Sequence, residues 1–546
     1  MNVSKQFLRY ASKCFSERIN HFVVTTPIYY VNSAPHIGHA YTSLLADIIT
    51  RWQKVKDLEA VNVFTATGTD EHGNKILQAA ARTDHSDVRM FCDEQSELFL
   101  SLLNDLNINY GAFVRTTSES HRQKVEMFWN ILMKRGAIEK GTYKGWYSVN
   151  DEEFLAERET ELITRNDGAL IRTSKSSGHD VTEIEEVNYM FDLHPFKDQI
   201  LDHLNKGWVR PTHFSEIVRA WISDESIMER KLSVSRPSSR CDWGIQVPDD
   251  PSQTIYVWLD ALVSYLTATD NRFVNGFWPA DLQIVGKDIL KFHAVYWPSF
   301  LLAAEYTLPK RILCHSHWLS EGQKMSKSKG NVVDPFKYLG SNNSDCLRLY
   351  LVAQSHLSRD GNFSHQNFIE LIDYFANSFG NAAGRVMNKR CLEVIDYMYP
   401  YPSDINFEKA LSVSGKLVEE LECVIEKTYR NYEEYVFNPA WEDISKVLHL
   451  LNKFLQDSKF WKSFDDINFV SSVVYLTFEC LRCCSILLSP ITPLTSFELL
   501  DRLSVRPNEM VYPNCKMYIS KNEDPPWSGR TLRPDIVPLV RKFSFE

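Results

Sequence analysis

The stretch HFVVTTPIYYVNSAPHIGH, residues 21–39, joins a β-rich run to a tight turn and the start of a helix. Its β-branched residues favour a strand before Pro27, and the turn at 32–35 leads into a helix that begins near His36. The same order returns at 61–73, where a strand ending near Thr67 precedes a loop and a further helix. Repeated strand–helix units predict a parallel α/β sheet with its sites at the carboxyl ends of the strands.

The pattern changes twice further along the chain. Several glycines and a charge run after Gly136 predict a small inserted domain, after which strand–helix units resume. Beyond Pro335 the chain becomes helical, and apolar residues at helical spacing predict one buried helix face: Ile444, Val447, Leu448, Leu451, Phe454 and Leu455. We expect an N-terminal arm, a sheet domain in two halves, an insert, a cationic loop, a helical bundle and a tail, with these bounds: 1–20, 21–135 and 236–320, 136–235, 321–365, 366–500 and 501–546.

The composition is that of a folded, acidic protein. A length of 546 residues, 44% hydrophobic, predicts about three or four domains. Because the net charge is -10, a nucleic-acid partner must be held by a local basic or aromatic patch. Apolar runs fall short of the ~20 residues that a bilayer requires, so we expect no membrane span.

The cysteines indicate a reducing compartment, because the eleven of them are scattered along the chain and odd in number. Cys480 and Cys483 form a CxxC within the apolar stretch 473–488, and no second ligand pair lies nearby in the sequence. Buried helix cysteines are therefore expected there in preference to metal or redox ligands.

The first twenty residues are basic and amphipathic, with four Lys or Arg against a single acid, Glu17. This composition is typical of an organelle transit peptide and lacks the uninterrupted apolar core of a secretory signal. The alternative is a basic arm on a cytosolic protein.

Two motifs could carry chemistry. His36-Ile37-Gly38-His39 lies at the first strand-to-helix turn, where backbone N–H groups and the helix dipole favour a phosphate. Far downstream, KMSKSKGN at 324–331 forms a cationic loop. Taken alone, the first could be a capped helix start or half a zinc site, and the second a solvated turn.

Together and in this order, the two motifs resemble the signatures of class I aminoacyl-tRNA synthetases. Four further stretches follow the order of one branch, the methionyl-tRNA synthetases: TPIYY at 26–30, GTDEHG at 68–73, YVWLDA at 256–261, and GKDI at 286–289 followed by His293 and Trp297. The resemblance runs from about residue 21 to at least 461 and is highly specific.

The resemblance implies a Rossmann-like parallel-sheet catalytic domain with an inserted small domain, followed by an α-helical anticodon-binding bundle. It implies ATP-dependent activation of L-methionine to methionyl-adenylate and transfer to the 3'-terminal adenosine of tRNA(Met), in the mitochondrial matrix. Because no covalent enzyme intermediate is needed, positioning and cationic stabilisation supply most of the catalysis. Magnesium would accompany ATP through its phosphates. The implied catalytic residues are His36, Gly38, His39, Lys324 and Lys327, of which His36, His39 and Lys327 contact ATP.

The implied methionine site places Asp70 against the substrate ammonium. A thioether is soft and nearly apolar, so mostly aromatic walls suit it. Taken singly, each aromatic of the set is more often an ordinary core residue. The implied lining residues are Ile28, Tyr30, Trp258, Ala261, Tyr265, Ile289, His293 and Trp297.

The insert departs from the zinc-bearing members of the family. Between Cys92 and Cys241 there is no cysteine, and GWYSVNDE at 145–152 is similar to the metal-free type. We therefore expect no zinc or other protein-held metal. The insert is also too short for the editing domain of the isoleucyl, valyl and leucyl relatives.

In the helical half, Asn377, Asn381, Arg385 and Asn388 share one helix face, a pattern that by itself usually means solvated surface. The resemblance implies that Asn381 and Arg385 read the anticodon and that Trp461 stacks on a base. The family usually has Pro before this tryptophan, whereas Phe460 stands here. No appended domain follows, so we expect a monomer.

Three alternatives remain at this stage. One is another class I synthetase, and a second is a catalytically silent tRNA-binding paralogue, against which the intact His36, Asp70 and Lys327 argue. The third is a nucleotidyltransferase that shares the HxxH motif, which would lack the aromatic pocket and the helical half.

Overall fold

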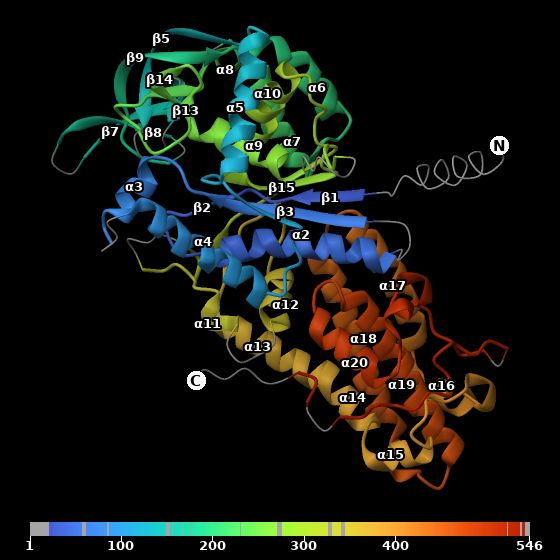
Figure 1. The fold of residues 1–546 in the computed structure, drawn as a ribbon. Helices are drawn as coiled ribbons and strands as arrows, with labels where there is room; N and C mark the ends of the chain where they lie inside the picture. The colour runs from blue at the N-terminus through green and yellow to red at the C-terminus, as the bar shows by residue number, and fades with distance from the viewer. Residues whose placement is uncertain are drawn as a thin grey trace, which may run out of the picture.

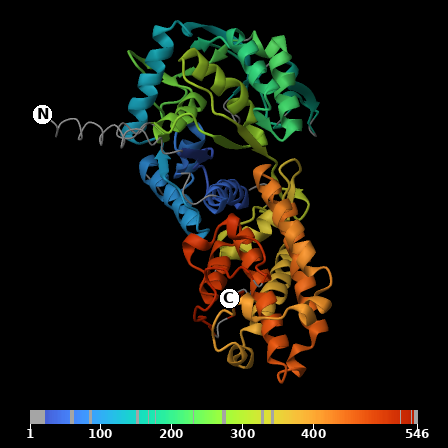
Figure 2. The same ribbon diagram turned by 90° about the vertical axis from the view of Figure 1, so that its right-hand side faces the viewer.

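The computed structural model describes residues 21–540 apart from short internal segments at 57–61, 84–86, 149–152, 156, 166–167, 176, 230, 270–275, 326–329, 340–343, 521 and 536–537. A sheet-containing half lies above an all-helical half in the view of Figure 1, and Figure 2 shows the same division after a quarter turn. The arm expected at 1–20 lies outside the described residues.

The centre of the upper half is a seven-stranded sheet with the order β10-β16-β15-β1-β3-β2, in which β4 also pairs with β3. Every pair in it is parallel, which confirms the predicted α/β class. The buried centre of β1, Val24, lies between Thr65 and Leu282. The strands are β1 (His21–Thr25), β2 (Tyr29–Tyr30), β3 (Asn62–Asp70), β4 (Ala112–Arg115), β10 (Val209–Arg210), β15 (Leu282–Gly286) and β16 (Ile312–His315).

Strand β3 is longer than the sequence predicted, because it continues to Asp70 where we expected a loop from Gly68. The added residues pair with β2 and β4. A Cβ atom at Gly68 would lie 2.0 Å from the Val114 carbonyl oxygen, so only glycine allows this close approach of β4. The strand thereby carries Asp70 to the sheet edge.

Helices cover both faces of the sheet. In Figure 1, α2 and α4 lie below it and α5, α9 and α10 above it. Helix α2 packs on β1, β3 and β15, and α9 packs on β3 and β4. The bounds are α2 (Ile37–Lys56), α3 (Asn74–Ala80), α4 (Val88–Asp105), α5 (Glu119–Lys134), α9 (Val257–Thr269) and α10 (Trp297–Ala303).

Small antiparallel sheets lie beyond the upper face, with the orders β11-β9-β5-β6, β7-β8 and β12-β14-β13. The insert was expected at 136–235. Strand β10, at 209–210, lies in that range but pairs with β16, so the main sheet includes a strand from the expected insert. The strands are β5 (Ile138–Ser148), β6 (Glu153–Leu155), β7 (Thr160–Thr164), β8 (Leu170–Ser174), β9 (Thr182–Phe191), β11 (Leu232–Ser233), β12 (Ser235–Pro237), β13 (Gln246–Val247) and β14 (Asp250–Ile255), and the helices are α6 (Lys197–Asn205), α7 (Thr212–Ser223) and α8 (Glu225–Met228).

The lower half is a helical bundle joined to the sheet by a small sheet of β17 (Trp318–Ser320), β18 (Gln323–Lys324) and β19 (Gly361–Phe363). All six residues of the predicted apolar face lie in α18 and are buried, so this prediction is confirmed. The helices are α11 (Phe336–Leu339), α12 (Asp345–Ala353), α13 (His365–Phe375), α14 (Asn381–Val386), α15 (Lys389–Val394), α16 (Glu408–Ser414), α17 (Leu417–Glu433), α18 (Phe437–Ser458), α19 (Ile467–Leu488) and α20 (Pro493–Arg502).

Helix α19 corrects one expectation, because it is long and apolar enough to span a bilayer by length and composition. In the structure 94% of its apolar window is buried, so it is the core helix of the bundle. Cys480 and Cys483 are buried in it, which confirms their interpretation as helix core residues.

The two halves meet along α2. Asp47, in the middle of this helix, accepts hydrogen bonds from Arg348 of α12 at 2.7 Å and from Arg51 at 2.6 Å. The Arg348 guanidinium is fully buried and also donates to three backbone carbonyl oxygens, those of Leu106, Pro490 and Ile491. A buried charge pair with all its polar atoms satisfied fixes the position of α2.

We predict that Asp47→Asn destabilises the protein by about 3 kcal/mol or more, because it leaves the buried Arg348 charge without compensation. The midpoint of urea unfolding measures the effect. The matched control is Asp202→Asn, which removes an exposed pair with Lys206 and should leave the midpoint unchanged. Equal midpoints for the two variants would contradict the role of the buried pair.

Candidate active site

The first motif occupies the amino end of α2. The backbone N–H of His36 donates to Nδ1 of His39 at 3.1 Å, and the N–H of Gly38 donates to Nδ1 of His36 at 3.1 Å. The two rings stack with their centroids 3.8 Å apart. Because each Nδ1 accepts a hydrogen bond, the neutral rings carry their hydrogens on Nε2, as donors. A Cβ atom at Gly38 would lie 2.9 Å from the His36 ring, so glycine is required for this stack.

The cationic loop begins and ends beside this turn. The Val333 carbonyl accepts a hydrogen bond from the Ile37 N–H at 3.1 Å, and the Asn331 amide donates to the Lys324 carbonyl at 3.1 Å. Lys324 itself is exposed on β18. Lys327 lies outside the described residues, but the anchored ends fix where the loop that carries it begins and ends.

The predicted amino-acid pocket starts at the carboxyl end of β3. Asp70 and Tyr30 are register partners of the adjoining strands β3 and β2, and both are half-buried. Ile28 lies half-buried in the segment between β1 and β2. Since α9 packs on β3, this edge faces the helix that carries Trp258, Ala261 and Tyr265.

The aromatic members of the pocket contact one another. Tyr265 donates its hydroxyl hydrogen to Nε2 of His293 at 2.7 Å, and Nδ1–H of His293 donates to the Ile289 carbonyl at 2.9 Å. Trp258 presents its ring at right angles to His293, with centroids 6.3 Å apart. Trp297 lies 6.1 Å from Tyr265, fully buried. The structure therefore brings together these four residues, which the sequence placed in two separate motifs.

Burial keeps the titratable side chains His293 and Tyr265 of this pocket uncharged. Burial lowers the pKa of His293 to about 4, so the ring is neutral at physiological pH. Burial also raises the pKa of Tyr265, which keeps its hydroxyl protonated. The Trp297 indole N–H has no hydrogen-bond partner among the described residues. Apart from Asp70 at the carboxyl end of β3, the pocket thus offers aromatic faces and weakly polar groups without a charge.

His293 and Trp297 lie on an irregular helical segment. Residues Phe292–Tyr296 form a π-helical turn before α10 begins at Trp297. Such turns are inserted irregularities that re-aim side chains and are frequent at functional sites. The sequence predicted a helix here and gave no sign of the widened turn.

A buried charged network lies behind the pocket and was not assigned from the sequence. Asp260 of α9 bonds Nδ1 of His72 at 2.6 Å and Nε2 of His121 at 2.8 Å. Burial alone would raise the pKa of Asp260, but the interactions with His72 and His121 lower it to about 2. The network ties the loop after Asp70 to the pocket helix. Its partners are up to 188 residues apart, so spacing could not reveal it.

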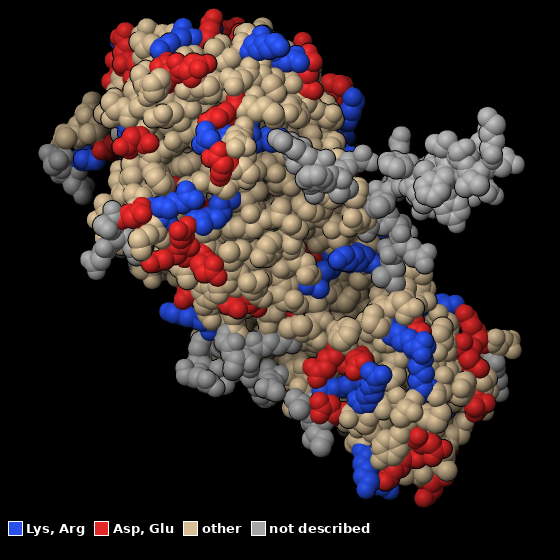
Figure 3. All heavy atoms as spheres, viewed as in Figure 1, with Lys and Arg blue, Asp and Glu red and all other residues tan. Residues whose placement is uncertain are grey.

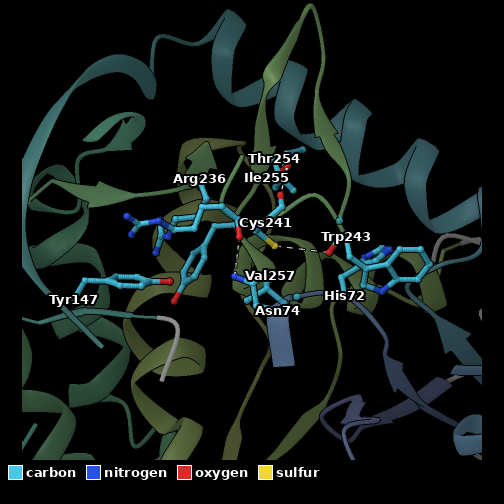
Figure 4. Close-up of a pocket in the computed structure, with 13 residues that line it drawn as sticks. His72, Asn74, Tyr147, Arg236, Cys241, Trp243, Thr254, Ile255 and Val257 are labelled. Carbon is cyan, nitrogen blue, oxygen red and sulfur yellow. Dashed lines mark hydrogen bonds between the residues drawn. The ribbon is translucent and has the colours of Figure 1, made fainter. Parts of the chain in front are cut away.

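A small pocket adjoins the network and is drawn in Figure 4. Arg236 is 6% exposed, its guanidinium lies 4.3 Å from the Tyr256 ring centroid, and its Nε has no hydrogen-bond partner within the described part of the chain. Trp243 donates its indole N–H to the Glu71 carbonyl at 2.6 Å. The sequence reasoning missed both of these cavity residues, and no local motif marks them. His72 and Cys241 are also part of the lining.

The residues expected to read an anticodon lie at the far end of the bundle. Asn381 and Arg385 are exposed on α14, directly after a second π-helical turn at Ala376–Gly380. Trp461 is 39% exposed in a short helical turn whose preceding residue, Phe460, is buried with its ring 5.6 Å away. The two elements lie at the same end, because Arg390, five residues after Arg385, contacts the ring of Phe464, three residues after Trp461, at 3.9 Å.

Comparisons with known proteins agree with this geometry. The family model described as "tRNA synthetases class I (M)" matches residues 22–387, and the one described as "Anticodon-binding domain of tRNA ligase" matches 415–537. The mitochondrial methionine–tRNA ligases of Xenopus laevis and Homo sapiens are each 38% identical to this chain, covering 94% of it and 91% and 88% of their own lengths.

A solved structure gives the same result. The methionyl-tRNA synthetase of Mycobacterium tuberculosis bound by methionyl-adenylate superposes with a TM-score of 0.84 at 32% identity, covering 96% of this chain and 100% of that one. Family model, relatives and fold coincide over nearly the whole chain, and the chain therefore belongs to the methionyl-tRNA synthetases of class I.

Proposed function

We propose that this protein is the methionine–tRNA ligase of mitochondria, which activates L-methionine with ATP and transfers it to the 3'-terminal adenosine of tRNA(Met). The assembly of four residues of the family's aromatic pocket is the observation that carries this proposal. Strand β2, which includes the lining residue Tyr30, reaches the paired histidines of α2 through Tyr29, whose ring centroid lies 5.1 Å from that of His39. Relatives named as mitochondrial ligases, together with the basic segment 1–20, support location in the matrix.

The first step joins the methionine carboxylate to the α-phosphate of ATP and releases pyrophosphate. Nε2–H of His36 and of His39 would donate to phosphate oxygens at the amino end of α2, where the helix dipole also favours negative charge. Gly38 keeps this approach open. Lys324 and Lys327 would neutralise the departing pyrophosphate from the anchored loop.

Magnesium would enter with ATP and offset phosphate charge. Magnesium usually keeps several of its waters and is bound largely through substrate phosphates, so the nucleotide itself would carry the ion. We propose that the enzyme needs no zinc, because the segment 145–152 carries none of the cysteines that zinc-bearing relatives use.

The methionine would lie between β3 and α9. Asp70 would pair with its ammonium, and the thioether would lie among Trp258, Tyr265, His293 and Trp297. Because Tyr265 donates its hydrogen to His293, its oxygen can only accept, whereas the Trp297 indole can donate to sulfur. Ile28, Tyr30, Ala261 and Ile289 would complete the apolar lining.

The tRNA would contact both halves of the chain. We propose the functional segments stated above, with the catalytic domain at 21–135 and 236–320 and the anticodon-binding bundle at 366–500. Asn381, Arg385 and Trp461 would read the CAU anticodon. We propose a monomeric enzyme that acts away from membranes, with α19 as an internal helix.

Pyrophosphate exchange with each of the twenty amino acids, followed by aminoacylation of tRNA(Met), tests the function as a whole. Exchange only with methionine is the expected result. Exchange with another amino acid would indicate a different class I specificity, and tRNA binding without exchange would indicate a catalytically silent paralogue.

Lys327→Ala should lower kcat for adenylate formation by roughly a hundredfold or more and change the methionine KM little, because the charge acts when pyrophosphate leaves. Steady-state pyrophosphate exchange measures both constants. Lys206→Ala, an exposed lysine far from the site, is the control. A variant at Lys327 with near-normal exchange would remove that residue from the mechanism.

The methionine KM should be constant between about pH 6 and 8, because His293 is already neutral there. A folded-state pKa of about 4, below the ordinary 6.5, means that the folded protein keeps this ring neutral until the pH falls toward 4. The free energy of unfolding, in contrast, decreases as the pH falls from 6.5 to 4, because the unfolded chain then binds a proton at His293 and the folded chain does not. Exchange assays across this range measure KM. If the wild-type KM changed near pH 6.5 and His293→Gln abolished that change, the neutral state assigned to His293 would be wrong.

Trp461→Ala should reduce aminoacylation efficiency by roughly ten to a hundredfold and leave pyrophosphate exchange unchanged, because a lost base stack typically costs ~1 to 3 kcal/mol. Phe497→Ala is the matched control, since Phe497 is an exposed aromatic on α20. Aminoacylation of tRNA with the CAU anticodon and of tRNA with an altered anticodon measures how well each variant discriminates between them. If discrimination by the folded Trp461 variant were intact, another residue would read the anticodon.

A further inference from the structure

A stacked pair of side chains lies next to Trp461 and belongs to neither the sequence-predicted site nor the core. The Arg390 guanidinium lies 3.9 Å from the centroid of the Phe464 ring. Phe464 is half-buried against the bundle core, whereas Arg390 is exposed on α15. At this separation the guanidinium lies against one face of the ring, and the exposed side of the cation is available to a further planar group.

Short hydrogen bonds hold this pair beside the anticodon residues. The Ser463 N–H donates to the Phe460 carbonyl at 2.9 Å, which keeps Phe464 within one turn of Trp461. On the other side, the Asn388 amide donates to the Arg385 carbonyl at 2.6 Å and its oxygen accepts from the Cys391 N–H at 3.2 Å. Arg385 and Arg390 therefore flank one clamped turn.

Arg385 and Arg390 are two cationic side chains at this end of the bundle. Within the described residues no ion pair includes Arg385 or Arg390. The carboxylate of Asp466 is engaged by Lys409 at 2.7 Å and by the first turn of α19. Figure 3 shows basic and acidic side chains together at the lower tip of the bundle, where Figure 1 places α15. An unpaired guanidinium held flat on an aromatic ring is a known means of stacking an unpaired RNA base.

We propose that Arg390, supported by Phe464, is a second stacking platform that binds an unpaired base of the tRNA anticodon loop beside the base held at Trp461. The proposal rests on the proposed function, because it requires tRNA(Met) as the partner. Two neighbouring platforms, one on α15 and one in the Trp461 turn, would hold two bases of the loop splayed apart, with Arg385 and Asn381 directed at their edges.

Arg390→Gln and Phe464→Leu test the platform, and an anticodon stem–loop RNA is the probe. Each change should weaken binding of this RNA, measured by fluorescence anisotropy, by about tenfold and lower aminoacylation efficiency equally. Pyrophosphate exchange and the thermal midpoint should be unchanged. Because the two side chains act as one unit, the double variant should bind the RNA no more weakly than the more damaging of the two single variants.

Arg390→Lys separates stacking from simple charge attraction, since lysine retains the charge but has no planar face. Continued weak binding by Arg390→Lys supports the platform, and full rescue would overturn it in favour of a phosphate contact. Arg430→Gln is the matched control, because Arg430 is an exposed arginine of α17 paired with Glu426. Unchanged RNA binding by Arg390→Gln, with binding lost in Trp461→Ala, would overturn the platform and leave the proposed function standing. A wild-type protein that fails to charge tRNA(Met) would instead overturn that function.

Discussion

The buried ion pair between Asp47 and Arg348 is the constraint on which the arrangement of the site depends. Helix α2 begins directly after His36 and carries His39 in its first turn, and its position along the sheet is fixed at its midpoint by this pair. At the far end of the helix Trp52 stacks on Tyr432 with centroids 4.7 Å apart. A helix held at its middle and its end can move at its first turn only together with the bundle.

Hydrogen bonds also hold the two loops that carry the signature residues. The loop of the second signature is held by a hydrogen bond to the first turn of α2, and the loop after β3 is held to α9 through Asp260. Described residues of both loops are therefore tied to a helix that packs on the sheet. Catalysis that depends on placing charged phosphates and a carboxylate benefits from such fixed supports.

Sequence reasoning reached the strand–turn–helix units and the buried face of α18, because each is encoded in local spacing. The pocket residues were named from the family resemblance, and four of them contact one another in the structure. It did not reach the extension of β3, which depends on contact between Gly68 and Val114 across two strands. The Asp260 network was also out of reach, because its histidines come from distant segments. The apolar stretch 473–488 was recognised from the sequence, but the pairing of its two charged residues, Glu479 and Arg482, in the interior was not.

The joining of the two halves along α2 has a consequence for how the chain reaches its native state. One hydrophobic cluster extends from Val24 to Val540, so the lower face of the sheet is completed by segments that leave the ribosome last. Contacts of such long sequence separation form late and slowly. Until they form, the apolar side of α2 is open to other chains, and aggregation competes with folding. The first half of the protein thus depends on the last helices for its solubility as well as for its geometry.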